Sequence, residues 1–219
     1  MPLTAPDLRL ALSRPLPGHA EFAALSGYPR PSLEASLSMH PPPRESAVLI
    51  LVHPVAGQDH TLLMRRPVYA GVHSGQIAFP GGKREAADAS LIDTALREFR
   101  EETGAATSAF EIVGELSRIH IPPSRTLVTP VVAWAPALGN LVPDPHEVDA
   151  LLDVPLAHLL RNDILHRMPI PMGPGRMDRM AAYWDVNGEV VWGATAMMIA
   201  ELRTVLGFPV SAPWRPGEP

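Results

Sequence analysis

Apolar and polar positions along the chain follow two periods, and each period predicts a different kind of element. Short apolar runs at 46–53 and 61–64 are typical of paired, buried strands. From Leu91 onward the apolar residues recur at helical spacing, which predicts one amphipathic helix. Asp88 or Ser90 can cap its first amides, and Gly104 stands where a left-handed terminator is expected.

The rest of the chain continues this alternation of strands with few helices. The elements predicted downstream are strands at 111–120 and 126–135, a short helix at 154–160, a hairpin at 183–192 turned by Asn187-Gly188, and a closing helix at 194–206. This order favours an α/β (α+β) fold in which helices flank a mixed sheet.

The prolines divide the chain into three parts. They number 26 and are concentrated near both ends. We therefore expect an irregular, proline-rich N-terminal extension at 1–45, one catalytic domain at 46–206, and a tail at 207–219.

Composition narrows the class of protein. The 219 residues are 46% hydrophobic and 19% charged, as in globular proteins, and no apolar run is long enough to span a membrane or to resemble a signal peptide. We therefore expect a cytoplasmic protein without a membrane partner. The net charge of −5 argues against nucleic acid and favours a small-molecule substrate, whereas the oligomeric state is not indicated. Without cysteine, any metal must use oxygen or imidazole ligands.

Three carboxylates on the predicted helix carry the strongest chemical signal. Glu98, Glu101 and Glu102 are spaced i, i+3 and i+4, so they project from one side. Their charges repel one another and oppose the helix dipole at the C-terminal end, which a solvated helix face does not explain well. Magnesium or manganese, which prefers oxygen ligands, would relieve that repulsion. The preceding Gly81-Gly82 pair can bring backbone close to a metal or a phosphate.

The segment from Gly82 to Ala105 resembles the Nudix box, G-x5-E-x7-R-E-U-x-E-E-x-G-U, where U is apolar. The match runs without interruption from Arg97 to Ala105. Upstream it loosens, because Gly82 lies one residue further from Arg97 than in the general box and Asp88 replaces the first glutamate. The chain is identified on these residues as a member of the Nudix hydrolases.

A second pattern is similar to the signature of the coenzyme A pyrophosphatase subgroup, L-L-T-x-R-S-x3-R-x3-G-x3-F-P-G-G. It covers 62–82 with its spacing preserved, and the resemblance extends over about 46–206. Met64, Pro67 and Gly71 depart from the expected Thr, Ser and second Arg, and the last change removes one possible phosphate contact.

The resemblance implies a Nudix-type α/β/α sandwich with a central mixed sheet. It also implies metal-dependent hydrolysis of coenzyme A to 4′-phosphopantetheine and adenosine 3′,5′-bisphosphate. The cofactor would be Mg²⁺ or Mn²⁺, held by Glu98 and Glu102 with help from Glu101 and the Gly82 carbonyl. Arg97 would support catalysis by holding a neighbouring carboxylate, although an exposed helix arginine is an equally simple interpretation.

Residues outside the helix supply further candidates. Glu147 could be a general base or a further ligand, or only the cap of a following helix. Neighbouring strand residues point to opposite faces, so only one of Arg65 and Arg66 can face the site, and Arg66 matches the subgroup arginine as a substrate contact. The remaining substrate-binding candidates, which a solvated loop would also explain, are Lys83, Arg84 and His73.

Two other functions remain open on the sequence. A Nudix hydrolase for another nucleoside diphosphate derivative, such as ADP-ribose, would keep the same metal chemistry. A noncatalytic Nudix-fold binding module would be expected to lose the carboxylates, and all three are present.

Overall fold

The protein is described here from a computed structural model, which places every residue except 19–21, 23–24, 26–29, 71–72, 171–177 and 211–219. Its centre is a mixed sheet of eight strands with the order β3-β2-β1-β7-β5, onto which β4, β6 and β8 add by pairing with β1, β7 and β2. These strands are β1 (Arg44–Val55), β2 (Gln58–Arg65), β3 (Ile77–Ala78), β4 (Gly81–Lys83), β5 (Glu111–Glu115), β6 (Ile119–Ile121), β7 (Thr126–Trp134) and β8 (Ala150–Pro155). The β1–β7 pair is parallel and the other pairs are antiparallel.

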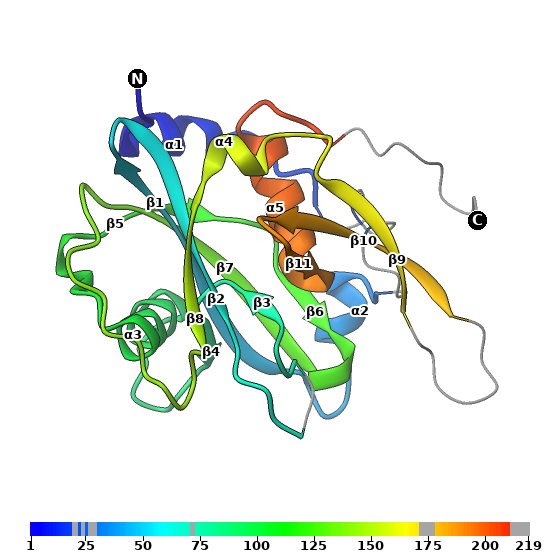
Figure 1. Cartoon of the computed structure of the whole chain (residues 1–219). Helices are drawn as coiled ribbons and strands as arrows, with labels where there is room; N and C mark the ends of the chain where they lie inside the picture. Colours follow the sequence, from blue (N-terminus) through cyan, green and yellow to red (C-terminus); the bar gives the residue numbers. More distant parts are fainter. Residues whose placement is uncertain (19–21, 23–24, 26–29, 71–72, 171–177, 211–219) are drawn as a thin grey trace.

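Strand β1 is buried on both faces, which explains its nearly continuous apolar sequence. Residues such as Leu49 and Leu51 face helix α3 (Leu91–Thr103), where Phe99 packs against them. The alternate residues Ile50 and Val52 belong to the core on the other face, beneath helix α5 (Gly193–Val205). Figure 1 shows the two helices on opposite sides of the sheet, so the predicted sandwich with a central mixed sheet is confirmed.

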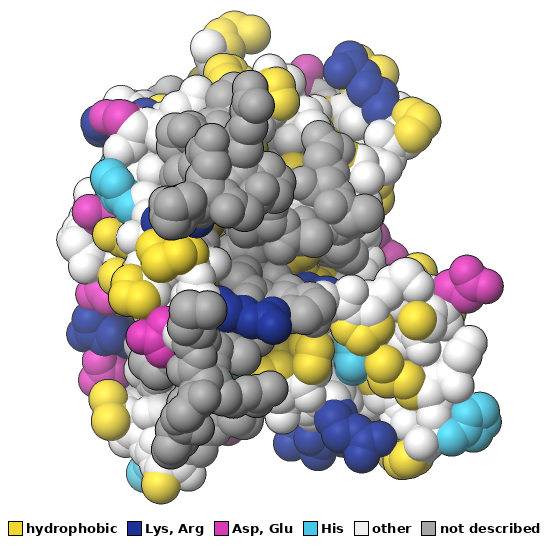
Figure 2. Space-filling model, turned by 90° about the vertical axis from the view of Figure 1, so that its right-hand side faces the viewer, with side chains coloured by type: hydrophobic (Ala, Val, Ile, Leu, Met, Phe, Trp, Pro, Cys, Tyr) yellow, Lys and Arg dark blue, Asp and Glu magenta, His cyan; other side chains and the backbone are white. Residues whose placement is uncertain are grey.

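A smaller antiparallel sheet extends beside α5. It has the order β11-β10-β9, with β9 (Leu165–Ile170), β10 (Arg179–Val186) and β11 (Glu189–Trp192). The predicted turn at Asn187-Gly188 is confirmed, since both residues have positive φ angles of 56° and 90°. On the molecular face that carries this sheet, the described hydrophobic side chains form small separate groups (Figure 2).

Two sequence predictions of local structure are wrong, and a third is wrong only at its boundary. The N-terminal extension contains helices α1 (Ala5–Leu12), which Thr4 caps, and α2 (Leu33–Leu37). The single strand predicted at 111–120 is divided into β5 and β6, with a register shift between Ile112 and Gly114 on β5. The short helix predicted at 154–160 is confirmed as α4 (Leu156–Leu159), although its first two predicted residues, Val154 and Pro155, are the end of β8. Most of the predicted tail, from residue 211, lies outside the described residues.

The N-terminal segment is joined to the sheet and to α5 by specific contacts. Trp134 Nε1 donates a hydrogen bond to the Leu3 carbonyl at 3.0 Å. The Gly18 amide donates to Glu201 on α5 at 3.1 Å, and Ser117 donates to the same carboxylate through its amide and its hydroxyl. Glu201 is fully buried, so these donors replace the water that its carboxylate lost on folding. Among the described helices, none has the length and apolar character needed to cross a bilayer.

Candidate active site

Helix α3 presents the three glutamates as the sequence predicts. Ser90 is its N-cap, with Oγ accepting from the Asp93 amide at 3.2 Å, and Gly104 ends it in the left-handed conformation at φ 72°. A side chain at Gly104 would collide with Val142, so this glycine is needed both for its conformation and for the close approach of the loop at 139–149.

The two glycines of β4 bring the backbone against the carboxylates. Gly82 pairs with Ala47 of β1, and a Cβ atom on Gly82 would lie 2.4 Å from Cδ of Glu98. A Cβ on Gly81 would lie 2.3 Å from the Ala47 carbonyl oxygen. Only glycine at these two positions allows β1, β4 and α3 to pack this closely.

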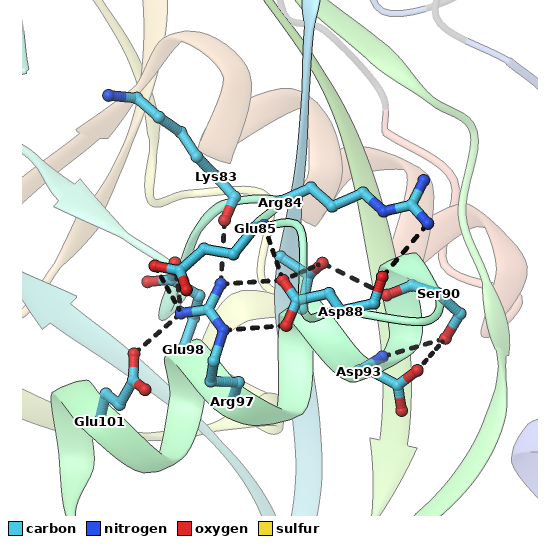
Figure 3. Close-up of polar contacts among 10 residues, drawn as sticks. Lys83, Arg84, Glu85, Asp88, Ser90, Asp93, Arg97, Glu98 and Glu101 are labelled. Atoms are coloured by element: carbon cyan, nitrogen blue, oxygen red, sulfur yellow. Dashed lines mark hydrogen bonds and ion pairs between the residues drawn. The ribbon is translucent and has the colours of Figure 1, made fainter.

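Arg97 is the centre of the polar network shown in Figure 3. Its Nε and Nη2 each donate to Asp88 at 3.0 Å, while Nη1 donates to Glu98 at 3.0 Å and to Glu101 at 2.8 Å. Nη2 also donates to the Lys83 carbonyl at 2.9 Å. The guanidinium therefore fixes two of the three glutamates and the end of β4 at once, a geometry that its planar fork of donors allows.

Asp88 anchors this arginine. Its side chain is only 5% exposed, and it also accepts from Thr94 Oγ1 and from the Glu85 amide, both at 2.9 Å. Arg97 holds the pKa of the Asp88 carboxyl far below its usual range, and Asp88 together with the glutamates raises the pKa of Arg97. From the sequence, Asp88 was only a possible cap and the replacement for the first glutamate of the box, and its pairing with Arg97 was not predicted.

Glu102 is the most buried of the three glutamates. Its Oε2 accepts from the Gly81 amide at 2.7 Å, and Arg66 Nη2 lies 3.9 Å from Oε1. Burial raises the pKa of Glu102 to about 8, against the lowering effects of Arg66 and of the Gly81 amide. Burial also raises the pKa of Glu98. The surrounding protein groups therefore stabilise the ionised forms of Glu98 and Glu102 less than water does.

The loop at 139–149 brings Glu147 to this site. The Val142 amide donates to the Thr103 carbonyl at 2.8 Å, and the Asp144 amide donates to the Glu102 carbonyl at 3.2 Å. The Glu147 amide then donates to the Asp144 carbonyl in a turn. The charge of Glu147 contributes to raising the pKa of both Glu98 and Glu102, which places its exposed carboxylate on their side of the molecule.

The predicted substrate contacts are distributed around this cluster. Arg66 lies beside Glu102 and donates to the Gly81 carbonyl at 3.2 Å, while Arg65 points away to Asp149 and Glu189. The Lys83 side chain extends away from the glutamates, as Figure 3 shows.

The other two candidates have local partners. Arg84 pairs with Glu45 at 2.9 Å and donates to the carbonyls of Asp88 and Ala89. His73 lies in the loop after β2 and contacts Gln76 at 3.0 Å. The structure thus gathers Arg66 and Glu147 with the box residues, whereas Lys83 and Arg84 flank them and His73 has its contact within its own loop.

The donor set has the chemistry of a hard-cation site. Glu98 and Glu102 are buried carboxylates whose ionised forms are disfavoured without a cation, and Gly82 leaves no room for anything but backbone beside Glu98. In the described part of the chain, no three acidic or imidazole groups already surround one point, because Arg97 draws Glu98 and Glu101 toward itself. The types of residue present suit a divalent cation. To bind one together, the glutamates would need only a change of side-chain conformation.

Comparison with known proteins agrees with this geometry. The family model described as NUDIX domain matches residues 43–170. A protein of Yersinia enterocolitica called uncharacterized Nudix hydrolase NudL is 35% identical over 80% of this chain and 85% of its own length. A protein of the same name from Photorhabdus laumondii is 33% identical over 76% of this chain and 90% of its own length.

A solved structure shares the fold. The Nudix hydrolase RenU of M. smegmatis superposes with a TM-score of 0.53 and 19% identity, covering 77% of this chain and 89% of that one. Together, the family match, the relatives and the glycine-bordered carboxylate helix show that the chain belongs to the Nudix hydrolases, enzymes that act on phosphoric anhydrides and generally use divalent metal cations.

Proposed function

We propose that this Nudix hydrolase cleaves the diphosphate bond of coenzyme A, or of its derivatives, to 4′-phosphopantetheine and adenosine 3′,5′-bisphosphate. The observation that carries the proposal is the subgroup-like pattern at 62–82, because it ends in the Gly81-Gly82 pair that borders Glu98 and Glu102. Its apolar members Leu62, Leu63 and Phe79 are buried, so that pattern also builds the sheet that positions the glycines.

The cation site in this proposal consists of Glu98, Glu102, Glu101 and the Gly82 carbonyl. Mg²⁺ or Mn²⁺ held there would neutralise the oxygens of the diphosphate and acidify a water molecule. Arg97 acts as a positioning residue, because it fixes Glu98 and Glu101 while Asp88 fixes Arg97. Positioning of this kind supplies much of the rate enhancement in phosphoryl-transfer enzymes.

Proton transfer is assigned to Glu147. Its exposed carboxylate lies on the turn at 144–147 and has no side-chain partner among the described residues, and its charge contributes to the raised pKa of Glu98 and Glu102. In the reaction, a water oxygen attacks one phosphorus, Glu147 accepts the water proton, and the bond from that phosphorus to the bridging oxygen breaks. The bridging oxygen leaves on the other phosphate. Among the described cations, Arg66 beside Glu102 is the one best suited to offset the negative charge of the substrate.

The test is incubation of the purified protein with coenzyme A and Mg²⁺ in ¹⁸O-enriched water, followed by mass spectrometry of both products. Formation of 4′-phosphopantetheine and adenosine 3′,5′-bisphosphate, lost in Glu102→Gln, is the expected result, and the ¹⁸O label identifies the phosphorus attacked. Glu147→Gln should lose most of the rate. Cleavage of ADP-ribose without turnover of coenzyme A would overturn the substrate assignment, and inertness toward both would favour a binding module.

A further inference from the structure

A surface pocket of about 430 Å³ lies next to the candidate site. Its charged lining consists of Arg44, Glu45, Lys83, Arg84, Glu85 and Asp88, which come from the start of β1, the end of β4 and the loop that leads into α3. No step of the proposed hydrolysis uses this pocket.

The pocket lining carries three cations and three carboxylates, and each of the carboxylates has an arginine partner within 4.0 Å. Glu45 forms an ion pair with Arg84 at 2.9 Å, Asp88 forms one with Arg97 at 3.0 Å, and Glu85 lies 4.0 Å from Arg97. Within the described residues, neither Arg44 nor Lys83 has a carboxylate within 4.0 Å. The side chain of Arg44 donates a hydrogen bond to the Ser124 carbonyl at 2.9 Å, which is a neutral acceptor. Two cations are thus available to an anion.

The pocket and the carboxylate site share a wall. Lys83 directly follows Gly82, whose α-carbon faces Glu98, and consecutive α-carbons are about 3.8 Å apart. The Lys83 carbonyl and the Asp88 carboxylate both accept from Arg97, while the Lys83 side chain extends away from the glutamates (Figure 3). A ligand with one phosphate at the glutamates can therefore extend past β4 toward this pocket.

We propose that the pocket is an anion subsite for a phosphomonoester on the substrate, separate from the diphosphate that is cut, with Lys83 and Arg44 as its specificity-determining residues. The proposal rests on the proposed function for the identity of that group, since coenzyme A carries a phosphomonoester on its ribose. Two point charges in a concave surface select a doubly charged phosphate over a neutral ribose hydroxyl, without base recognition.

The experiment measures binding of two nucleotides that differ only in that group, so it needs no turnover. Isothermal titration with Mg²⁺ present compares adenosine 3′,5′-bisphosphate with AMP. We expect the wild-type protein to bind the bisphosphate about 10-fold more tightly, the size of one or two charge-assisted hydrogen bonds. Lys83→Met and Arg44→Met should each reduce this preference, and the double variant should bring it below about 2-fold, with AMP affinity nearly unchanged.

Two further variants separate charge at the pocket from general effects. Lys83→Arg keeps the cation and should keep the preference. Arg14→Met removes one positive charge at an exposed position of the N-terminal segment and should leave the preference as in the wild type.

Equal affinity of the wild type for both nucleotides, or a preference that survives in the double variant, would overturn the subsite. The proposed function can fail independently: no turnover of coenzyme A, together with a preference that depends on Lys83 and Arg44, would leave the subsite standing for a different phosphorylated nucleotide.

Discussion

Gly82 and the carboxylate of Glu98 are so close that no side chain fits between them, since a Cβ on Gly82 would lie 2.4 Å from Cδ of Glu98. Gly82→Ala must therefore displace either β4 or Glu98. We expect hydrolysis to fall by about 100-fold or more, the cost of misplacing a catalytic group by about 1 Å. Steady-state kinetics with the proposed substrate, coenzyme A, provide the measurement.

A matched control is Gly139→Ala. Replacement of Gly139 strains the backbone, because its φ angle is 69°, but a Cβ there would meet nothing within 4 Å. This variant should lose about 1 kcal/mol of stability and retain its activity. If Gly82→Ala remains as active as Gly139→Ala, the close packing has no catalytic importance.

The pairing of Asp88 with Arg97 predicts a large effect on stability. Asp88→Asn leaves the guanidinium of Arg97, whose side chain is 15% exposed, without its main anion. Loss of one partner from a largely buried pair costs about 3 kcal/mol, and we expect a loss of that size in urea unfolding with an accompanying decrease in kcat. Asp93→Asn makes the same chemical change at an exposed position of α3 and should cost less than about 1 kcal/mol. Similar losses in the two variants would contradict the anchoring role of Asp88.

Glu102 should show opposite effects on stability and activity. It is 2% exposed and its charge is disfavoured by burial, so Glu102→Gln should raise the free energy of unfolding in EDTA by about 1 kcal/mol while it abolishes hydrolysis. Adding Mg²⁺ should raise the Tm of the wild type and leave that of Glu102→Gln nearly unchanged, because only the wild type retains the complete ligand set. An equal rise in both proteins would show that the cation binds elsewhere.

His120 predicts a dependence of stability on pH. Its ring is buried without a hydrogen-bond partner among the described residues, and burial lowers its pKa from 6.5, with Arg30 and Arg125 adding to the effect. Below pH 6.5, His120 therefore binds a proton in the unfolded chain, whereas in the folded protein it stays neutral until the pH falls to its lower pKa. The free energy of unfolding should fall as the pH drops from 6.5 toward the lower pKa of the folded protein.

Replacement of the ring tests this dependence. Urea unfolding at pH 7.5 and 5.5 should show a smaller difference for His120→Met than for the wild type. Burial also lowers the pKa of His53, so His53 should still contribute to the pH dependence of stability in this variant. His40→Met, at an exposed position, should behave as the wild type. An unchanged difference in His120→Met would assign the acid sensitivity to other groups.

Periodic patterns and caps allowed the site helix to be predicted closely. The helix, its Ser90 cap and its Gly104 terminator are local features, because each depends on residues within one or two turns. The hairpin at Asn187-Gly188 was predicted for the same reason. Strand β8 was missed because its extended conformation depends on pairing with the distant strand β2, whereas Pro155 does precede the short helix α4 as its N-cap.

The contacts around the box required the folded structure. Arg66 and Glu102 are 36 positions apart in the sequence, and no spacing rule shows that β2 places one beside the other. Asp88 is a comparable case, because its importance depends on three donors that converge only when the loop before α3 closes. The chemical types in the site could be predicted, and their pairing depended on tertiary packing.

The buried carboxylate of Glu201 sets a practical limit on how this protein can be shortened. A chain that begins at Ser46, near the start of the family match, would lack the Gly18 amide that donates to Glu201. It would also lack Ala5 and Leu8, and the apolar core residues that they cover would be exposed. The catalytic helix on the other face of the sheet would be left intact in sequence. In such a shortened protein, the buried carboxylate of Glu201 on α5 would lack one of its hydrogen-bond donors. The protein would also tend to aggregate through the surface that α1 normally covers.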